Sequence, residues 1–240
     1  NIYDRKNATA ACEWLKARAA APDDKPWALY VGFVAPHYPL VVPSRFFEMY
    51  RLADIPLPKM HPRDGHKRHP WVETLDDVIG QDHFFADDDE RKRAIAAYWG
   101  LCSFVDAEIG LVLDALRESG FEENTRVIYT SDHGDNLGAR GLWGKSVLYE
   151  ESTRIPLIAA GPDIPGGKVT QTPATLLDIH PTALNTLGEN TEGQTEGDSL
   201  IDLANAPDAR ERLVASEYHA MGAPTSSFML RRGDWKYHYY

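Results

Sequence analysis

The chain has 240 residues, of which 43% are hydrophobic and 10% aromatic, which is enough apolar material for a folded core and excludes a disordered chain. Its 25 basic and 36 acidic side chains give a formal net charge of −11, which argues against a nucleic-acid-binding surface. No run of about 18 apolar residues occurs, so a membrane-spanning helix is not expected. Two cysteines, Cys12 and Cys102, are too few for a disulfide-stapled scaffold or a cysteine-based zinc cluster.

The first predicted elements are a helix and a strand. Residues 7–21 place Ala11, Leu15 and Ala19 on one helical face. The continuous apolar run 27–34 is typical of a strand that is buried on both faces.

The stretch 51–90 is polar, rich in Pro and His, and without a clear period. Excursions of this length inside a domain tend to be functional or poorly ordered. His61, His66 and His69 lie near one another in it, so a second metal site is one interpretation and a solvated loop is the simpler one.

Strands and helices then alternate. A helix is predicted over 88–119, because residues 87–90 are acidic, which suits a helix start, and apolar residues follow at steps of three and four. Strands are predicted over 126–131 and 155–160, and a further helix over 173–187. This order indicates an α/β fold, with a sheet that carries helices on both faces.

The pattern changes beyond about residue 212. Three strands are predicted there, over 213–218, 226–231 and 235–240, with Arg232-Gly-Asp234 as a hairpin turn. We therefore expect 1–211 to be the later part of an α/β domain and 212–240 to be the start of a small antiparallel C-terminal subdomain.

The residues best suited to chemistry follow the strand at 126–131. Asp132 and His133 would emerge at its carboxyl end, where α/β sheets bind ligands, and a carboxylate beside an imidazole suits a divalent cation. A glycine-rich loop follows and ends at Lys145, whose charge could reach an anion near the metal. The alternative is a turn that merely closes a connection between a strand and a helix.

A second candidate is His37, which follows the apolar run 27–34 and lies between Pro36 and Pro39. A histidine held rigidly there could donate a hydrogen bond to an anionic oxygen or a leaving group. A surface histidine in a loop is the alternative.

Together these segments resemble the sulfatase family of the alkaline-phosphatase-like superfamily. The resemblance rests on Ala35-Pro-His-Tyr-Pro-Leu, Thr130-Ser-Asp-His-Gly-Asp-Asn-Leu-Gly, Gly141-Leu-Trp-Gly-Lys and Arg154-Ile-Pro-Leu. The Asp-His pair and Glu217-Tyr-His219 are similar to choline-sulfatase-like and phosphonate-monoester-hydrolase-like members.

The resemblance implies an alkaline-phosphatase-like sheet and a role for each matching residue. Asp132 and His133 match two ligands of a single divalent metal, usually Ca²⁺, although Mg²⁺ or Mn²⁺ would also suit them. Lys145 matches the lysine that contacts the sulfate and the leaving-group side, and His37 the histidine that holds a sulfate oxygen. His219 is a further candidate near the substrate entrance, and a surface strand residue is an equal alternative.

One part of the family's machinery has no match in this sequence. Family members use a formylglycine nucleophile made within a Cys/Ser-x-Pro-x-Arg motif, and neither Cys12 nor Cys102 lies in such a motif. The chain also begins without an initiator Met or a signal-like segment. We therefore expect a piece of a longer protein, with the formylglycine upstream, and no turnover by these residues alone.

The implied function is metal-dependent hydrolysis of small sulfate monoesters, in a protein that could form homo-oligomers. A phosphonate or phosphate monoester hydrolase on the same scaffold is one alternative. A non-catalytic anion-binding pseudo-enzyme is the other.

Overall fold

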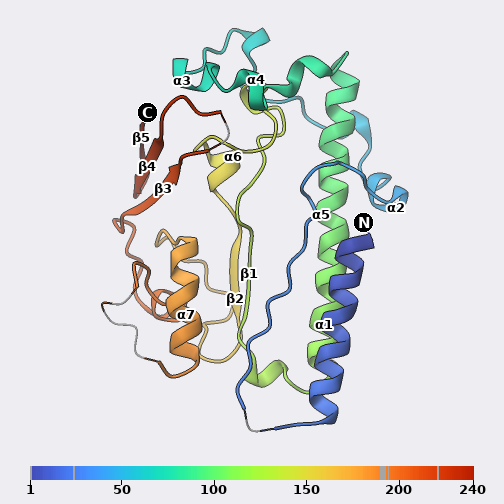
Figure 1. Ribbon diagram of the computed structural model, residues 1–240, viewed down its shortest axis with the longest axis vertical. Coiled ribbons are helices and arrows are strands. Elements are labelled where there is room, and N and C mark those ends of the chain that lie inside the picture. The colour runs from blue at the N-terminus through green and yellow to red at the C-terminus, as the bar shows by residue number, and fades with distance from the viewer. Residues whose placement is uncertain (1, 24, 190–192, 194, 221) are drawn as a thin grey trace. The chain divides into compact units, whose positions relative to one another are not determined.

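The computed structural model describes residues 2–23, 25–189, 193, 195–220 and 222–240 (Figure 1). The chain forms two compact units. The first contains the residues up to Lys59 together with His83–Thr125, and the second contains Met60–Asp82 together with Arg126–Tyr240.

Two long helices that lie side by side dominate the first unit, α1 (Ile2–Ala20) and α5 (Asp88–Glu118) (Figure 1). The carboxylate of Asp87 caps α5 by accepting a hydrogen bond of 2.9 Å from the Glu90 N–H, and Gly120 follows the helix end at φ +74°. Both predicted helices are confirmed, and α1 begins five residues before the predicted start.

The core of the first unit lies along α5. Arg5 of α1 reaches the fully buried Glu108 of α5, with Nη2 2.6 Å from Oε1. The short helix α2 (Ser44–Phe47) packs on α5, and η1 (Leu52–Asp54) follows it. The apolar cluster consists of Ala35, Phe46, Leu101, Phe104 and Val105.

The run 27–34 is extended but forms no strand, so the prediction of a buried strand was wrong for this chain. Tyr30 is 93% exposed. The backbone of this run bonds to side chains of α1 and not to a neighbouring strand. Asn7 donates to the Gly32 carbonyl at 2.7 Å, and Asp4 accepts from the Val34 N–H at 2.7 Å. An apolar run gives a strand only where another strand supplies its partners.

Two strands of the second unit pair in antiparallel fashion, β1 (Val127–Thr130) and β2 (Leu157–Ala160). Val127 lies opposite Ala160 and Thr130 opposite Leu157. Both strands were predicted. The 3₁₀ turn η4 (Glu122–Asn124), in the first unit, precedes β1, and η5 (Ala139–Gly141) and α6 (Glu150–Thr153) lie between the strands.

The predicted helix over 173–187 is present as η6 (Leu176–Asp178) continued by α7 (Ile179–Thr186). It begins later than predicted because Thr175 and Asp178 form a reciprocal capping box that fixes the start. Helix α8 (Leu200–Asn205) follows.

The last three strands form one antiparallel sheet in the order β3 (Val214–Tyr218), β4 (Ser227–Arg232) and β5 (Trp235–Tyr239). Gly233, at φ +55°, makes the turn between β4 and β5, which confirms the predicted hairpin. The division of the chain at 211/212 stays a prediction, since the two compact units divide it elsewhere.

The stretch 60–84 is structured, contrary to the expectation of a long excursion without elements. It holds η2 (Pro62–Asp64), α3 (Pro70–Glu73), α4 (Asp76–Ile79) and η3 (Gln81–Phe84). Elements of three or four residues are too short to show a helical period in the sequence. Four buried side chains of this stretch form an apolar core of the second unit together with Leu142 and Val147: Trp71, Val72, Leu75 and Ile79.

Helix α5 is long and apolar enough to cross a membrane by length and composition. The core helix of a soluble protein passes the same test, and α5 buries Leu101 and Glu108 within the first unit. This feature is therefore weak evidence for a membrane span.

Candidate functional site

Asp132 and His133 lie just beyond the end of β1, as the sequence predicted. The Asp132 side chain is 82% exposed, and its Oδ2 lies 3.4 Å from Nε2 of His133. Asp132 Oδ1 also accepts the His133 N–H at 3.0 Å. The pair therefore presents a carboxylate and an imidazole together at the end of a strand.

The tautomer of His133 follows from its neighbour. Nδ1 lies 2.9 Å from the carbonyl oxygen of Gly134, and a carbonyl only accepts, so Nδ1 carries the proton. This leaves a lone pair on Nε2, the nitrogen nearest Asp132. A metal-ligating histidine is typically oriented by such a bond. The two donors thus fit part of a divalent-cation shell, although no group of three such side chains occurs in the described parts of the chain.

Gly134 joins this pair to α6. Its N–H donates to the Ser152 carbonyl at 2.8 Å. A Cβ at position 134 would lie 2.0 Å from the carbonyl oxygen of Glu151, which no real side chain tolerates. The backbone that follows Asp132 and His133 and that of α6 are therefore in direct contact.

The loop that leads to Lys145 is fixed by two residues to which the sequence analysis gave no role. Asp135 Oδ1 accepts the N–H groups of Leu137, at 2.8 Å, and Gly144, at 3.0 Å. Asn136 donates to the Gly144 carbonyl from its backbone N–H and from Nδ2, each at 2.7 Å. The residue before Lys145 is thus held from both sides. Asp and Asn side chains commonly accept the backbone N–H two residues ahead, and the sequence Asp135-Asn136 shortly before Gly138 is a turn signal that could have identified Asp135.

Lys145 itself is half-buried, on the same loop as Asp132 and His133. Asp132, His133 and Lys145 therefore all lie between β1 and α6, in the second unit.

His37 belongs to the first unit. Its Nδ1 lies 2.8 Å from the carbonyl oxygen of Tyr38 and therefore donates to it, as in His133. The peptide bonds before Pro36 and Pro39 are both cis. Asp4 accepts the N–H groups of Val34 and Ala35 immediately upstream. His37 is consequently presented with Nε2 as its accepting nitrogen.

His219 is tied into the hairpin between β3 and β4. Its Nδ1 lies 2.8 Å from Ser226 Oγ and its Nε2 lies 2.8 Å from Glu217 Oε2, with the ring edge against Phe228. Both nitrogens serve local contacts, which favours the structural alternative. Its role near a substrate stays a prediction.

The three histidines of the 60–70 stretch did not gather into a metal site within the described residues. His61 and His69 instead cap short helices, since their Nδ1 atoms accept the N–H groups of Arg63 and Trp71, each at 3.2 Å.

A charged cluster fastens α6 to the last sheet. Glu150 Oε1 lies 2.7 Å from Lys236 Nζ, and Oε2 lies 3.1 Å from Arg231 Nη1. Burial alone would raise the pKa of Glu150, but its bond to Lys236 and the two cationic charges outweigh this and lower the pKa. Burial lowers the pKa of Lys236, and burial with the Lys236 charge lowers that of His238.

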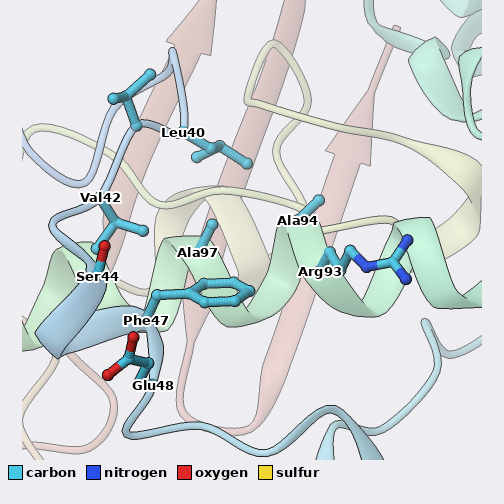
Figure 2. A pocket seen from close by; sticks show the side chains of 9 residues that line it. Leu40, Val42, Ser44, Phe47, Glu48, Arg93, Ala94 and Ala97 are labelled. Carbon is cyan, nitrogen blue, oxygen red and sulfur yellow. The ribbon is translucent and has the colours of Figure 1, made fainter.

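A shallow pocket of about 560 Å³ lies in the first unit, beside α5 (Figure 2). Figure 2 shows Leu40 and Val42 above Ala94 and Ala97 of α5, with Glu48 and Arg93 as its charged members. The full lining is Leu40, Val41, Val42, Ser44, Phe47, Glu48, Arg93, Ala94 and Ala97. None of the predicted site residues lines it.

Comparison with known proteins identifies the family. The family model named Sulfatase matches residues 1–189. A curated sulfatase of Formosa agariphila is 36% identical over 80% of this chain and 38% of its own length. A choline-sulfatase of Rhizobium meliloti is 31% identical over 99% of this chain and 47% of its own length.

Solved structures show the same fold. The chain superposes on a phosphonate monoester hydrolase from Silicibacter pomeroyi with a TM-score of 0.79 and 26% identity, covering 96% of this chain and 51% of the other. For the phosphonate monoester hydrolase of Agrobacterium radiobacter, the TM-score is 0.81 at 24% identity, covering 98% and 52%. The predicted alkaline-phosphatase-like α/β fold is confirmed. The chain spans about half the length of the curated relatives, or less.

Proposed function

The chain belongs to the sulfatase family, and from this premise we propose that the protein containing it hydrolyses sulfate monoesters with the help of a divalent metal. The observation that carries the proposal is the Asp132–His133 pair, whose Nε2 and carboxylate oxygens lie together at the end of β1. Named sulfatases among the relatives support it.

In this proposal Asp132 and His133 hold part of the metal shell. The ion is Ca²⁺ on family grounds, and the Asp132 carboxylate is the kind of oxygen ligand that Ca²⁺ favours. A bound divalent cation supplies positive charge next to a sulfate oxygen. The hydrogen bond from His133 Nδ1 to the Gly134 carbonyl fixes the tautomer, so Nε2 is the nitrogen that would ligate the metal.

Lys145 and His37 would act on the ester itself. The Lys145 ammonium would stabilise the negative charge of the sulfate and of the leaving oxygen. His37, in its imidazolium form, would donate a hydrogen bond from Nε2 to a sulfate oxygen or to the leaving oxygen. The formylglycine nucleophile of the family would come from residues outside this sequence, because neither cysteine lies in the required motif.

The test uses the full-length protein and 4-nitrophenyl sulfate. Lys145→Ala should lower kcat/KM by about a hundredfold, the scale of losing one electrostatic contact to the transition state, and leave the unfolding midpoint unchanged. Asp132→Ala should weaken Ca²⁺ binding measured by calorimetry. Wild-type turnover in Lys145→Ala together with wild-type Ca²⁺ affinity in Asp132→Ala would contradict the proposal.

A phosphonate monoester hydrolase is the second candidate, and the likeness to the hydrolase of Silicibacter pomeroyi favours it. The two substrates share a tetrahedral anionic centre, so the same cationic groups suit both. Comparing kcat/KM for 4-nitrophenyl sulfate and 4-nitrophenyl phenylphosphonate separates them, and absence of turnover with both indicates a non-catalytic anion-binding protein.

A further inference from the structure

A buried polar contact lies beneath the loop that carries Lys145. Asp82, His61 and Trp143 are all buried in the second unit. The indole Nε1 of Trp143 donates to Asp82 Oδ1 at 3.2 Å. On the other side of the carboxylate, His61 Nε2 lies 2.9 Å from Asp82 Oδ2, off the line of a well-aligned hydrogen bond.

The orientation of His61 is defined by its role as a helix cap. Its Nδ1 accepts the N–H of Arg63 at 3.2 Å, so the ring proton of neutral His61 lies on Nε2 and faces Asp82. Asp82 therefore accepts a hydrogen bond from Trp143 and faces the ring N–H of His61, and these two residues are far apart in the sequence.

Trp143 is held at its backbone as well as at its ring. Its N–H donates to the Ile79 carbonyl at 2.9 Å. Two residues before Trp143, a Cβ at Gly141 would lie 3.2 Å from Pro62 Cδ. The loop therefore packs directly against the segment that carries His61. Trp143 lies two residues before Lys145, and Gly144 between them is fixed by Asp135.

A carboxylate buried beside an apolar cluster is an expensive way to gain stability, because desolvation offsets most of the electrostatic gain. A carboxylate does, however, fix the orientation of the groups that donate to it, because its two oxygens accept hydrogen bonds only from defined directions. The contacts of Asp82 specify where the Trp143 indole lies, and through the short link at Gly144 they restrict the position of Lys145.

We propose that Asp82, supported by His61, is a positioning residue that acts through Trp143 to place the Lys145 ammonium at the site. This rests on the proposed function for the role of Lys145. The indole bond to Asp82 restrains the loop, and the catalytic effect of the restraint is exerted only through Lys145.

The chain offers a matched pair of variants for the test. Trp143→Phe removes the indole N–H that binds Asp82 and keeps an aromatic ring. Trp71→Phe removes an indole N–H that donates to Thr225 Oγ1 at 2.9 Å and makes no bond to Asp82. Because Trp71 packs in the apolar cluster that includes Leu142 and Val147, it controls for the loss of an indole beside the same loop. Both tryptophans are 7% exposed.

In the full-length protein, Trp143→Phe should lower kcat for 4-nitrophenyl sulfate by about tenfold, and Trp71→Phe by less than about twofold. In a Lys145→Ala background the loss from Trp143→Phe should disappear, because the residue acts through Lys145. When Asp82→Ala is added to Trp143→Phe, kcat should fall by less than about a further twofold, because both changes remove the same hydrogen bond. Equal losses in the two tryptophan variants, or an unchanged loss without Lys145, would overturn the proposal.

Hydrogen exchange separates this inference from the proposed function. Amide exchange across residues 138–146 should accelerate in Trp143→Phe and stay at the wild-type rate in Trp71→Phe, whether or not the protein turns over sulfate esters. If Lys145→Ala proves fully active, the proposed function of Lys145 fails while faster exchange still supports the restraint. Unchanged exchange in Trp143→Phe overturns the restraint itself.

Discussion

Arg212 donates two parallel hydrogen bonds to the carboxylate of Asp178, from Nη2 to Oδ1 at 2.7 Å and from Nη1 to Oδ2 at 3.0 Å. Asp178 is fully buried and also accepts the N–H groups of Thr175 and Asp198. The pair joins the start of α7 to the segment that leads into β3. The bond to Asp178 raises the pKa of Arg212.

Removing Arg212 should destabilise the second unit strongly. Arg212→Ala leaves a buried carboxylate without its cation, which typically costs about 3–5 kcal/mol in the free energy of unfolding. Arg210→Ala is the matched control, because Arg210 pairs with Asp234 at 2.9 Å with both side chains exposed. Urea denaturation of both variants checks this, and equal midpoints would contradict the assigned role of the buried pair.

Asp4 should matter for His37 as well as for α1. Asp4→Ala leaves the N–H groups of Val34 and Ala35 without their acceptor, and the buried Ala35 N–H alone typically costs about 1–3 kcal/mol. The loss should appear as a lower unfolding midpoint and, because these residues lead into Pro36-His37, as lower turnover by the full-length protein.

Asp4→Asn keeps one acceptor oxygen and should lie between Asp4→Ala and wild type. Lys6→Ala, at an exposed position on the same helix, is the control and should behave like wild type. A variant Asp4→Ala with wild-type stability would show that water satisfies these amides.

Stability should fall on acidification because of the cluster at α6. The folded pKa of His238 lies below its ordinary 6.5, so the stability associated with neutral His238 is fully present above that pH and is lost as pH falls through the folded pKa. The folded pKa of Glu150 lies below its ordinary 4.5, so its contribution is present above pH 4.5 and is lost at lower pH.

Melting temperatures from pH 7.5 to pH 3.5 measure this effect. Glu150→Gln should flatten the acidic limb of the curve. Glu211→Gln is the control, since Glu211 pairs with Arg232 at the surface, at 2.9 Å. A curve with the wild-type slope in Glu150→Gln would contradict the assignment.

Neither cysteine should behave as an activated nucleophile. Burial raises the pKa of Cys102 to about 11 and also raises that of Cys12. At pH 8 roughly one Cys102 in a thousand would then be a thiolate, so labelling by iodoacetamide should be slow until the protein is unfolded. Cys102→Ser should retain full turnover in the full-length protein. Rapid labelling of native Cys102, followed by mass spectrometry, would refute this expectation.

The long elements were predictable from the sequence because their signals are local. The period of α5 and the acidic residues that precede it are contained in consecutive residues. The same holds for β1, β2 and the β4–β5 hairpin, whose turn needs a glycine at positive φ.

The run 27–34 could not be predicted, because its conformation depends on partners far along the chain. The residues that satisfy its backbone are Asp4 and Asn7, about 25–30 positions away, and a hydrophobic pattern does not encode them. The short helices between Pro62 and Phe84 were missed for a different reason, since each is about one turn long.

In the candidate site, too, features that depend on adjacent residues could be predicted and features that depend on distant residues could not. Asp132 and His133 are neighbours in the sequence, so their pairing could be predicted. The roles of Asp135 and Asn136 depend on Gly144, and that of Asp82 depends on Trp143, 61 positions away. Sequence identifies the residue types that do chemistry, whereas the groups that hold them in place are revealed only by the folded chain.

The close approach of Gly134 to α6 has a consequence for how this segment can vary. Position 134 requires glycine because of lack of space and not because of its backbone angle, since a Cβ there would meet the carbonyl oxygen of Glu151. Adding a single methyl group there would have to push back either α6 or the Gly134 carbonyl that orients His133. Position 134 is therefore closed to any residue larger than glycine as long as α6 keeps its place beside this loop.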